Sequence, residues 1–355
     1  MTLVTYPAAC KPHLQQWTLT QPMQRSRSAW TGREKRLVIS GARWSLASEV
    51  IPMRLATYQA WASFAAQCEG GLNTFQVYAT PATQSGPASA TWAMDGSGQV
   101  VNYALYSEQF DNAAWSKLNT AAITANSVVA PDGTTTGDTL NFSGNVNAAI
   151  QQDTALTAVA STTYTFSVYL YGTAGQTLTI YIGTSSGVGG SSAATVTLTA
   201  AFARYSVTVT LGGSPTGTIR VIASRNSGTA TTLYAWGAQV EIGAAASTYV
   251  ATTSAATTSR AAFKVTGLTV SSTNMTAGQM LTIDDRLYTL TADVVADSGG
   301  KAVVSVKPNL AALTTSTSVA YVQRPYAVVA MTDTPTVSVE PGPIYRVSFT
   351  AEEVF

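Results

Sequence analysis

Apolar and polar residues alternate with a period of two along most of the chain, as in strands with one buried and one exposed face. The clearest run is Tyr164–Tyr171, where the even positions are apolar and the odd positions are Thr165, Ser167, Tyr169 and Tyr171. Similar runs cover residues 178–182, 205–211 and 219–221, with glycines between them as turns. Short strands at this spacing predict a β-sandwich or jelly roll in the middle of the chain.

One segment departs from this alternation. Between Leu55 and Cys68 the apolar residues recur at steps of three and four, which indicates an amphipathic helix. Pro52 precedes the segment, and Gly70 and Gly71 follow it as a left-handed stop. We therefore predict one α-helix, over about residues 55–69, that packs on a sheet.

The last quarter of the chain also has the strand pattern. We predict strands at Phe263–Val265, Met280–Ile283, Arg286–Leu290, Ala302–Val306 and Tyr345–Phe349. Asp284 and Asp285 separate two of them and are expected to form a hairpin turn. The expected fold class is mainly β, with sandwich or barrel sheets and one flanking helix.

Charge divides the chain into three parts. Charged residues make up 10 % of the 355 residues, against roughly 25 % in an average soluble protein. Residues 1–54 carry eight basic and two acidic residues, whereas residues 101–258 carry four basic and six acidic ones. Small-residue connectors lie near 96–104 and 252–262, so we expect joints there. A chain with so little charge is poorly protected against association and is expected to belong to an assembly.

Two residue counts exclude several kinds of chemistry. His13 is the only histidine, so a multi-histidine metal site and a Ser-His-Asp triad are not expected. Cys10 and Cys68 are far apart and in no CxxC spacing. Two buried thiols are favoured over one disulfide. The first ten residues lack the basic segment and the following apolar segment of a signal peptide. We therefore expect synthesis and assembly in the cytoplasm.

Three local motifs have simpler explanations than chemistry. Gly183–Gly187 matches a nucleophile elbow, but strands flank it and the histidine lies far upstream. Asp132–Asp138 reads as a turn, with a Ca²⁺ site at the sandwich edge as the alternative. The basic residues of 1–54 favour an interface or a solvated loop over nucleic-acid binding. We expect no catalytic residue, no resident metal and no cofactor.

The candidate binding residues are outward-facing tyrosines of the middle segment. Tyr169, Tyr171 and Tyr181 fall with the polar positions of their strands, and Arg220 also points outward. Sugars present apolar C–H faces that stack on aromatic rings, while their hydroxyls need polar partners. We expect these four residues on one face of the sandwich as a carbohydrate site. The alternative is that this face packs on a neighbouring layer or subunit.

Four segments of the middle part carry a resemblance to a known domain. Tyr106–Trp115, Ala130–Thr134, Tyr164–Tyr169 and Ala235–Gly243 resemble, in this order, the carbohydrate-binding-module-like jelly roll common in bacteriophage tail proteins. The resemblance covers about 155 residues and implies a glycan-binding sandwich. Trp115 and Trp236 match its motifs. Because Trp236 shares strand parity with Tyr234 and Val240, we expect it in the core.

The flanking segments resemble the two halves of the distal tail protein of long-tailed phages. The matching residues are Ser40–Trp44 before the helix, Gly71–Phe75 after it, and Ala277–Ile283, Arg286–Tyr288, Val306–Leu310 and Ala351–Glu353 near the end. This resemblance implies one discontinuous tail-hub domain, residues 1–97 with 260–355. The carbohydrate-binding-module-like sandwich, residues 98–259, is inserted into it.

The resemblance also implies a function. Such hubs form rings, usually hexameric, that join the tail tube to the tail-tip or baseplate hub proteins and leave a lumen for DNA. The expected place is therefore the virion, without membrane insertion, and the insert is expected to bind host-surface glycans. An alternative is a peripheral receptor-binding adhesin whose main role is glycan binding. A glycan-degrading enzyme ranks last, because it needs paired carboxylates in a cleft.

Overall fold

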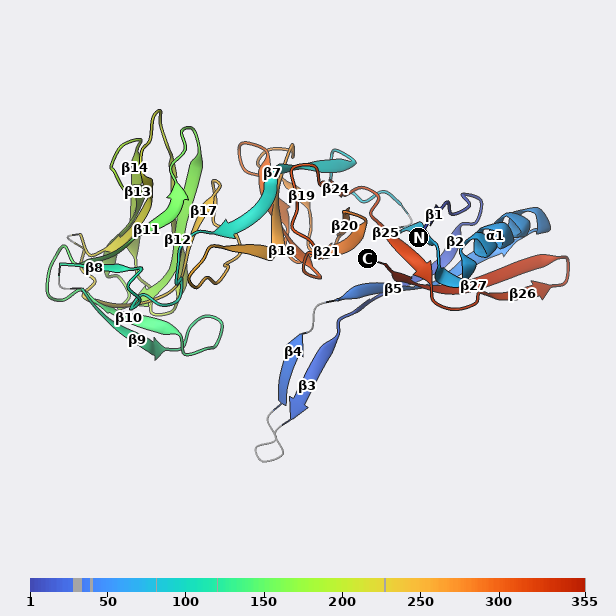
Figure 1. Cartoon of the computed structure of the whole chain (residues 1–355), viewed down its shortest axis with the longest axis horizontal. Coiled ribbons are helices and arrows are strands. Elements are labelled where there is room, and N and C mark those ends of the chain that lie inside the picture. Colours follow the sequence, from blue (N-terminus) through green and yellow to red (C-terminus); the bar gives the residue numbers. More distant parts are fainter. Residues whose placement is uncertain (28–33, 39–40, 81, 120, 227, 355) are drawn as a thin grey trace. The chain divides into compact units, whose positions relative to one another are not determined.

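The computed structural model describes residues 1–27, 34–38, 41–80, 82–119, 121–226 and 228–354 (Figure 1). Ile39 and Ser40 therefore lie outside the described residues. The chain folds as two compact units, one of Met1–Gly98 with Arg260–Phe355 and one of Gln99–Ser259. Sandwich sheets, a closed barrel and one α-helix make up the described residues, so the predicted mainly β fold class is confirmed.

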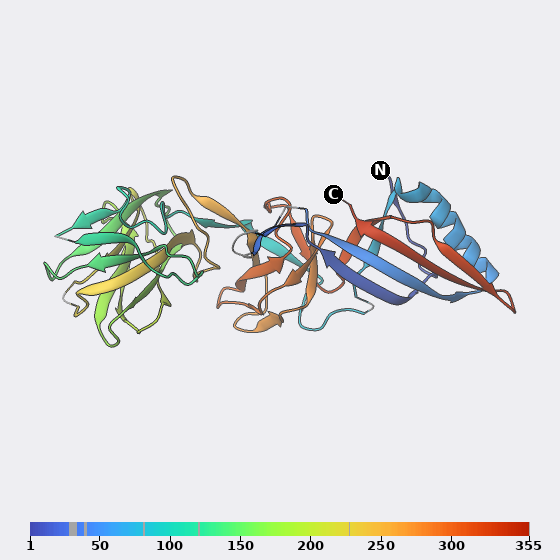
Figure 2. The same cartoon turned by 90° about the horizontal axis from the view of Figure 1, so that it is seen from below.

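The first unit begins with a mixed sheet in the order β1-β6-β25-β27-β5-β2, with β26 paired to β27. Its strands are β1 (Leu3–Val4), β2 (Pro12–Thr20), β5 (Arg43–Met53), β6 (Thr74–Tyr78), β25 (Tyr326–Met331), β26 (Thr336–Glu340) and β27 (Ile344–Glu353). The helix α1 (Leu55–Gln67) covers one face, followed by the short 3₁₀ turn η1 (Glu69–Gly71) (Figure 2). Trp61 and Phe64 are its buried side chains, which confirms the predicted helix and its packing on a sheet.

Both cysteines lie in the core between α1 and this sheet. Cys10 and Cys68 are free and buried, so the prediction of two buried thiols is confirmed. The Cys10 thiol donates to the Thr57 carbonyl, with 3.7 Å between sulfur and oxygen. Burial raises the pKa of both thiols, that of Cys68 to about 11. They are therefore inert, structural side chains.

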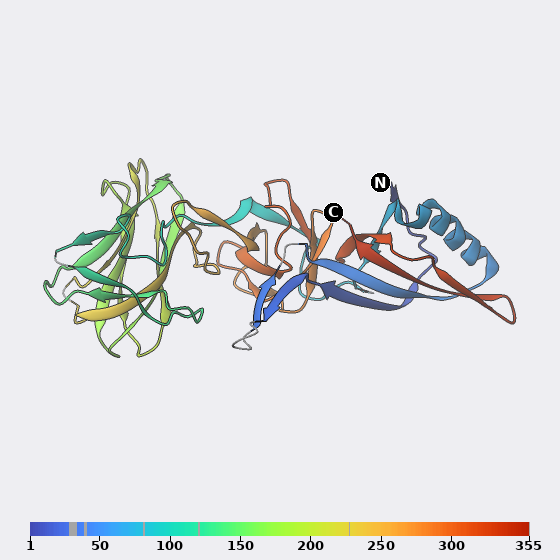
Figure 3. The same cartoon turned by 60° about the horizontal axis from the view of Figure 1, so that its bottom comes forward.

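A separate two-stranded ribbon carries part of the basic N-terminal segment. Its strands are β3 (Met23–Arg27) and β4 (Glu34–Val38), drawn in blue in Figure 3. In the antiparallel register Arg25 lies opposite Arg36. Within the described residues the two strands pair only with each other.

The rest of the first unit is a closed barrel in the order β18-β23-β21-β20-β24-β7. Its strands are β7 (Thr91–Asn102), β18 (Thr257–Thr266), β20 (Met280–Ile283), β21 (Arg286–Leu290), β23 (Lys301–Lys307) and β24 (Val319–Tyr321), with β19 (Thr273–Met275) and β22 (Val294–Val295) as an extra pair. Asp284 and Asp285 both have positive φ between β20 and β21, as a type I′ hairpin turn requires. The predicted hairpin is confirmed.

Glu353 ties the first sheet to the barrel. The residue is 2 % exposed, and its side chain accepts hydrogen bonds from the backbone N–H of Leu287 at 2.8 Å and of Trp44 at 3.3 Å. The Trp44 indole N–H donates to the Leu287 carbonyl at 2.9 Å. Three segments far apart in sequence therefore meet at one buried carboxyl group.

The second unit is a sandwich of two five-stranded sheets. One sheet has the order β15-β12-β17-β10-β9, formed by β9 (Ala122–Val128), β10 (Gly137–Asn141), β12 (Thr163–Gly172), β15 (Ala203–Thr210) and β17 (Thr232–Ile242). The other has the order β14-β13-β16-β11-β8, formed by β8 (Ser116–Leu118), β11 (Ala149–Thr157), β13 (Thr177–Thr184), β14 (Ser191–Thr197) and β16 (Thr218–Ser224). Inward residues of both sheets form one core, whose buried members among the described residues lie between Ala104 and Val240.

The two ends of this sandwich lie side by side. The chain leaves the barrel through β7 and returns through β18, which are neighbours in the closed barrel. Asn102, fully buried, donates to the carbonyls of Ala238 at 2.9 Å and Val250 at 2.7 Å. The side-chain Oδ1 of Asn102 accepts hydrogen bonds from the backbone N–H groups of Ala104 and Val240, both at 3.0 Å. One side chain thus holds the entering and leaving segments together.

Candidate functional site

The structure does not bring the four candidate residues together. Tyr169 and Tyr171 lie on β12, whereas Tyr181 lies on β13 and Arg220 on β16. β12 belongs to one sheet, and β13 and β16 belong to the other. Since the inner faces of the two sheets pack on each other, these side chains point to opposite outer faces. The prediction of one shared face is therefore wrong.

The outer face around Tyr169 is filled by its own aromatic rings. The ring of Tyr169 lies 5.4 Å from that of Trp236 and 6.3 Å from that of Tyr249, centroid to centroid. The Arg204 guanidinium lies 5.4 Å from the Tyr169 centroid and donates to Ser167 Oγ at 2.9 Å. Tyr169 is half-buried, and its ring packs on these neighbouring side chains.

Trp236 is buried but does not belong to the core between the sheets. Gly237 has φ +63° and interrupts the alternation of β17, so that Ala235 and Ala238 both face inward. Trp236 therefore faces outward, is 4 % exposed, and donates from its indole N–H to Thr136 Oγ1 at 3.0 Å. The sequence prediction assumed unbroken parity, and the irregularity at Gly237 overturns it.

Tyr249 closes this cluster from the segment that follows β17. Its hydroxyl is 2.7 Å from Ser107 Oγ and donates to Glu108 Oε1 at 3.0 Å. Burial raises the pKa of Tyr249 and that of Glu108. Neither residue was singled out from the sequence, because Tyr249 lies outside any regular strand pattern.

The ring of Tyr171 also packs on neighbouring aromatic rings. It stacks on Tyr234 with centroids 4.3 Å apart and an interplanar angle of 17°, and it meets Phe202 edge-on at 4.5 Å. Burial raises its pKa. This half of the outer face is a packed, half-buried aromatic layer.

The outer face around Tyr181 is different, because it is hollowed. A shallow depression of about 340 Å³, the Tyr181 groove, is lined by residues from all five strands of the second sheet. Its lining contains one aromatic ring, aliphatic groups and uncharged polar groups, from Leu118, Asn147, Ala149, Thr179, Tyr181, Ala193, Ile222, Ser224 and Asn226. Sequence reasoning identified only Tyr181 among these. The others are ordinary residues that strand pairing gathers from distant segments.

Strand register explains how the groove is built. Thr179, Ser224 and Ala149 form one outward row, and Tyr181 and Ile222 lie in the next. Tyr181 leans along its strand over Gly183, because a Cβ atom added to Gly183 would collide with the Tyr181 hydroxyl oxygen. Within the described residues no other aromatic ring packs on Tyr181. Gly183 thus provides the space in which the tyrosine ring lies.

Arg220 and Asp153 occupy the row beyond Tyr181. Arg220 lies opposite Asp153 on one side and Gly183 on the other. Its Nε donates to Asp153 Oδ1 at 2.6 Å and its Nη2 to Oδ2 at 2.7 Å. This ion pair raises the pKa of Arg220. A row spacing of about 7 Å separates it from the row of Tyr181.

The motifs weighed as chemistry have structural explanations. Ser185 of the elbow-like sequence lies between strands β13 and β14, and its Oγ accepts from the Thr218 N–H at 2.9 Å. Asp132 accepts from the Thr134 N–H at 2.9 Å. Asp138 accepts from the N–H groups of Phe110 at 2.7 Å and Asn126 at 2.8 Å, and burial raises its pKa. Among the described side chains, no group of three or more His, Cys, Asp or Glu could hold a metal.

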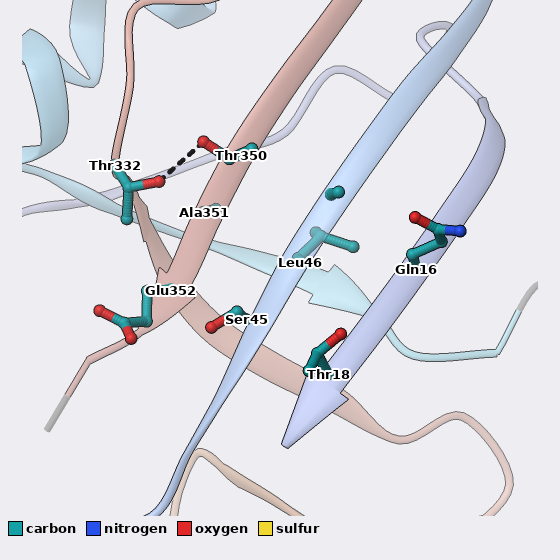
Figure 4. A pocket seen from close by; sticks show the side chains of 9 residues that line it. Gln16, Thr18, Ser45, Leu46, Thr332, Thr350, Ala351 and Glu352 are labelled. Atoms are coloured by element: carbon teal, nitrogen blue, oxygen red, sulfur yellow. Dashed lines mark hydrogen bonds between the residues drawn. The ribbon is translucent and has the colours of Figure 1, made fainter. Parts of the chain in front are cut away.

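A second depression, of about 260 Å³, lies on the first sheet (Figure 4). Register places Thr18, Ser45 and Glu352 in one row across β2, β5 and β27. Glu352 pairs with Arg43 at 3.2 Å, and Thr332 and Thr350 share a hydroxyl hydrogen bond of 2.8 Å. With no aromatic ring and one ion-paired carboxylate in its lining, this depression suits neither sugar stacking nor acid–base catalysis.

The helices of the described chain include none that is long and apolar enough to cross a membrane.

Comparisons with known proteins give weak similarities. No protein-family model matches the sequence, and no curated protein sequence does. One similar solved structure is the enzymatically active domain of bacteriophage CBA120 tailspike protein 4, with 16 % identity and a TM-score of 0.32. The match covers 40 % of this chain and 21 % of that one, so it spans about a fifth of the length of the tailspike domain.

Carbohydrate-binding modules are also among the similar structures. The xylan-binding CBM22-1 domain of Paenibacillus barcinonensis Xyn10C has 10 % identity and a TM-score of 0.30, over 44 % of this chain and 99 % of that one. TmCBM61 in complex with β-1,4-galactotriose has 16 % identity and a TM-score of 0.28, over 39 % and 97 %. TM-scores this low assign no function to this chain.

Proposed function

We propose that this chain is a structural protein of the distal tail of a long-tailed phage whose second unit binds host-surface glycans. The first unit forms a ring, a hexamer, that joins the tail tube to tail-tip or baseplate hub proteins and encloses the path of the DNA. The Tyr181 groove is the observation that carries the glycan-binding part. The ring part is supported by the sequence resemblance and by the interruption of one unit by another between β7 and β18.

The groove offers what a pyranose ring needs. The half-buried ring of Tyr181 can stack on the C–H face of a sugar, and Ile222 and Leu118 extend the apolar floor. The side-chain amides of Asn147 and Asn226 are exposed and make no hydrogen bond within the described residues. They are able to exchange hydrogen bonds with sugar hydroxyls. A shallow site binds weakly, but six copies on one ring convert weak binding into avidity.

Replacing Tyr181 by alanine tests the glycan site. We expect Tyr181→Ala to weaken binding of the full chain to host cell-surface polysaccharide by about tenfold, since one aromatic stacking contact of about 1–1.5 kcal/mol is lost. Binding is measured by pull-down on purified host polysaccharide. Tyr171→Ala is the matched control on the opposite face and should bind as the unchanged chain does. Loss of binding in Tyr171→Ala alone would instead move the site to the face of β12.

Particle images and mass measurements test the ring. We expect the purified chain, or tails that carry it, to show a closed ring of six copies between tube and tip. A chain that stays monomeric, is absent from the tube–tip junction and still binds glycans would favour the adhesin alternative. Shortening of the polysaccharide during incubation would favour an enzyme, although the described residues of the groove lining include no carboxylate.

A further inference from the structure

The ion pair beside the Tyr181 groove has the geometry of a fixed recognition element. Arg220 and Asp153 exchange two parallel hydrogen bonds of 2.6 and 2.7 Å, which hold both side chains in one orientation. Their side chains are 29 % and 41 % exposed, so a ligand in the groove can reach both. The hydroxyl of Tyr181 lies over Gly183, the residue opposite Arg220. The Arg220–Asp153 pair therefore lies next to the hydroxyl end of the Tyr181 ring.

The pair retains capacity for hydrogen bonds. A guanidinium group has five N–H donors, and Asp153 uses two of those of Arg220. The other three have no partner within the described part of the chain. The Asp153 carboxylate likewise keeps lone pairs beyond the two bonds it accepts. A sugar hydroxyl, which both donates and accepts, can satisfy the two partners at once.

Charge sets the kind of sugar that fits. None of the described residues that line the groove is charged, and the net charge of the adjacent Arg220–Asp153 pair is zero. A carboxylate or sulfate placed beside Arg220 would also face Asp153, and repulsion from that carboxylate would cancel the attraction. Such an anion would still lose part of its hydration. A neutral hydroxyl group meets no such repulsion, and losing its hydration costs less than for an anion.

We propose that the Tyr181 groove selects neutral, hydroxyl-rich oligosaccharides, with Asp153 excluding uronic-acid and sulfated sugars by neutralising Arg220. This inference rests on the proposed glycan binding and specifies its ligand class. Asp153 is here a specificity-determining residue, and Tyr181 supplies the stacking surface.

An oligosaccharide array tests the selectivity with the full chain. The probes are neutral oligosaccharides printed beside uronic-acid and sulfated oligosaccharides of the same length. The unchanged chain should bind neutral probes and bind the anionic ones at least about tenfold more weakly. Asp153→Asn keeps the shape of the side chain and removes its charge, so binding of anionic probes should rise about tenfold. Asp132→Asn removes one negative charge from a turn outside the groove and serves as the control.

The outcomes separate the two proposals. No binding to any probe, with the chain folded, would overturn the proposed glycan binding. Equal or tighter binding of anionic probes by the unchanged chain would overturn the selectivity and leave glycan binding intact. A gain of anionic binding that is the same in Asp153→Asn and Asp132→Asn would assign the effect to net charge and also overturn the role of Asp153.

Discussion

Asn102→Ala is expected to destabilise the sandwich by about 4 kcal/mol. The substitution removes four hydrogen bonds, three of them to fully buried residues and one to the half-buried Val250, each at a cost of about 1 kcal/mol or more. These groups lie where the two ends of the unit meet. Calorimetry of the full chain should show the transition of the second unit at a clearly lower temperature.

Two further variants make this result specific. Asn102→Asp keeps the acceptor but loses both donors and places a carboxylate against the carbonyls of Ala238 and Val250, so it should be as destabilising as alanine. Asn141→Ala removes an exposed amide whose side-chain hydrogen bonds, within the described residues, are to nearby Ser143, and it should cost less than about 1 kcal/mol. Equal effects of Asn102→Ala and Asn141→Ala would show that the buried amide does not hold the ends.

Glu353→Ala is expected to cost the first unit about 3 kcal/mol, because the buried N–H groups of Trp44 and Leu287 lose their acceptor. The adjacent Glu352 is a matched control. It is partly exposed and pairs with Arg43, so Glu352→Ala should cost less than about 1 kcal/mol. Chemical denaturation followed by a probe in the first unit measures both. Similar losses for the two variants would contradict the role of Glu353.

Glu353 also makes the first unit sensitive to pH. Burial raises its pKa, against the opposing hydrogen bonds and Arg286, so the folded state binds its proton more tightly than the unfolded state does. The stabilisation is complete below the unfolded value of about 4.5 and is lost as pH rises through the raised value. Glu353→Gln should flatten this decline in the stability of the first unit above pH about 4.5. An unchanged decline would place the titrating group elsewhere.

Local patterns in the sequence predicted local structure well. The recurrence between Leu55 and Cys68 identified the helix, and Asp284-Asp285 identified a hairpin turn, because each depends on neighbours within a few residues. Strand parity also correctly separated Tyr169 and Tyr181 from the inward positions. These features follow from periods of 3.6 and 2 and need no knowledge of distant contacts.

Assignment of strands to sheets could not be predicted in this way. Parity states whether Tyr181 faces outward, but the order of strands decides which outer face it reaches. Trp236 lies on the outer face and not in the predicted core, because Gly237 interrupts the alternation of inward and outward residues in β17. Asn147 and Asn226 were missed because only the pairing of distant strands brings them to Tyr181. Of the candidate site, the sequence therefore identified Tyr181 and Arg220 but not the other groove residues.

The juxtaposed ends of the sandwich have a consequence for the barrel. While the second unit is folded, β7 and β18 are joined by what amounts to a tight turn, although about 160 residues separate them. If that unit melts, the barrel must close a loop of about 160 residues instead of about ten. Four doublings of loop length, at about 0.6 kcal/mol each, raise the entropic cost of closure by about 2.5 kcal/mol. The folded second unit therefore stabilises the barrel as a covalent crosslink between β7 and β18 would.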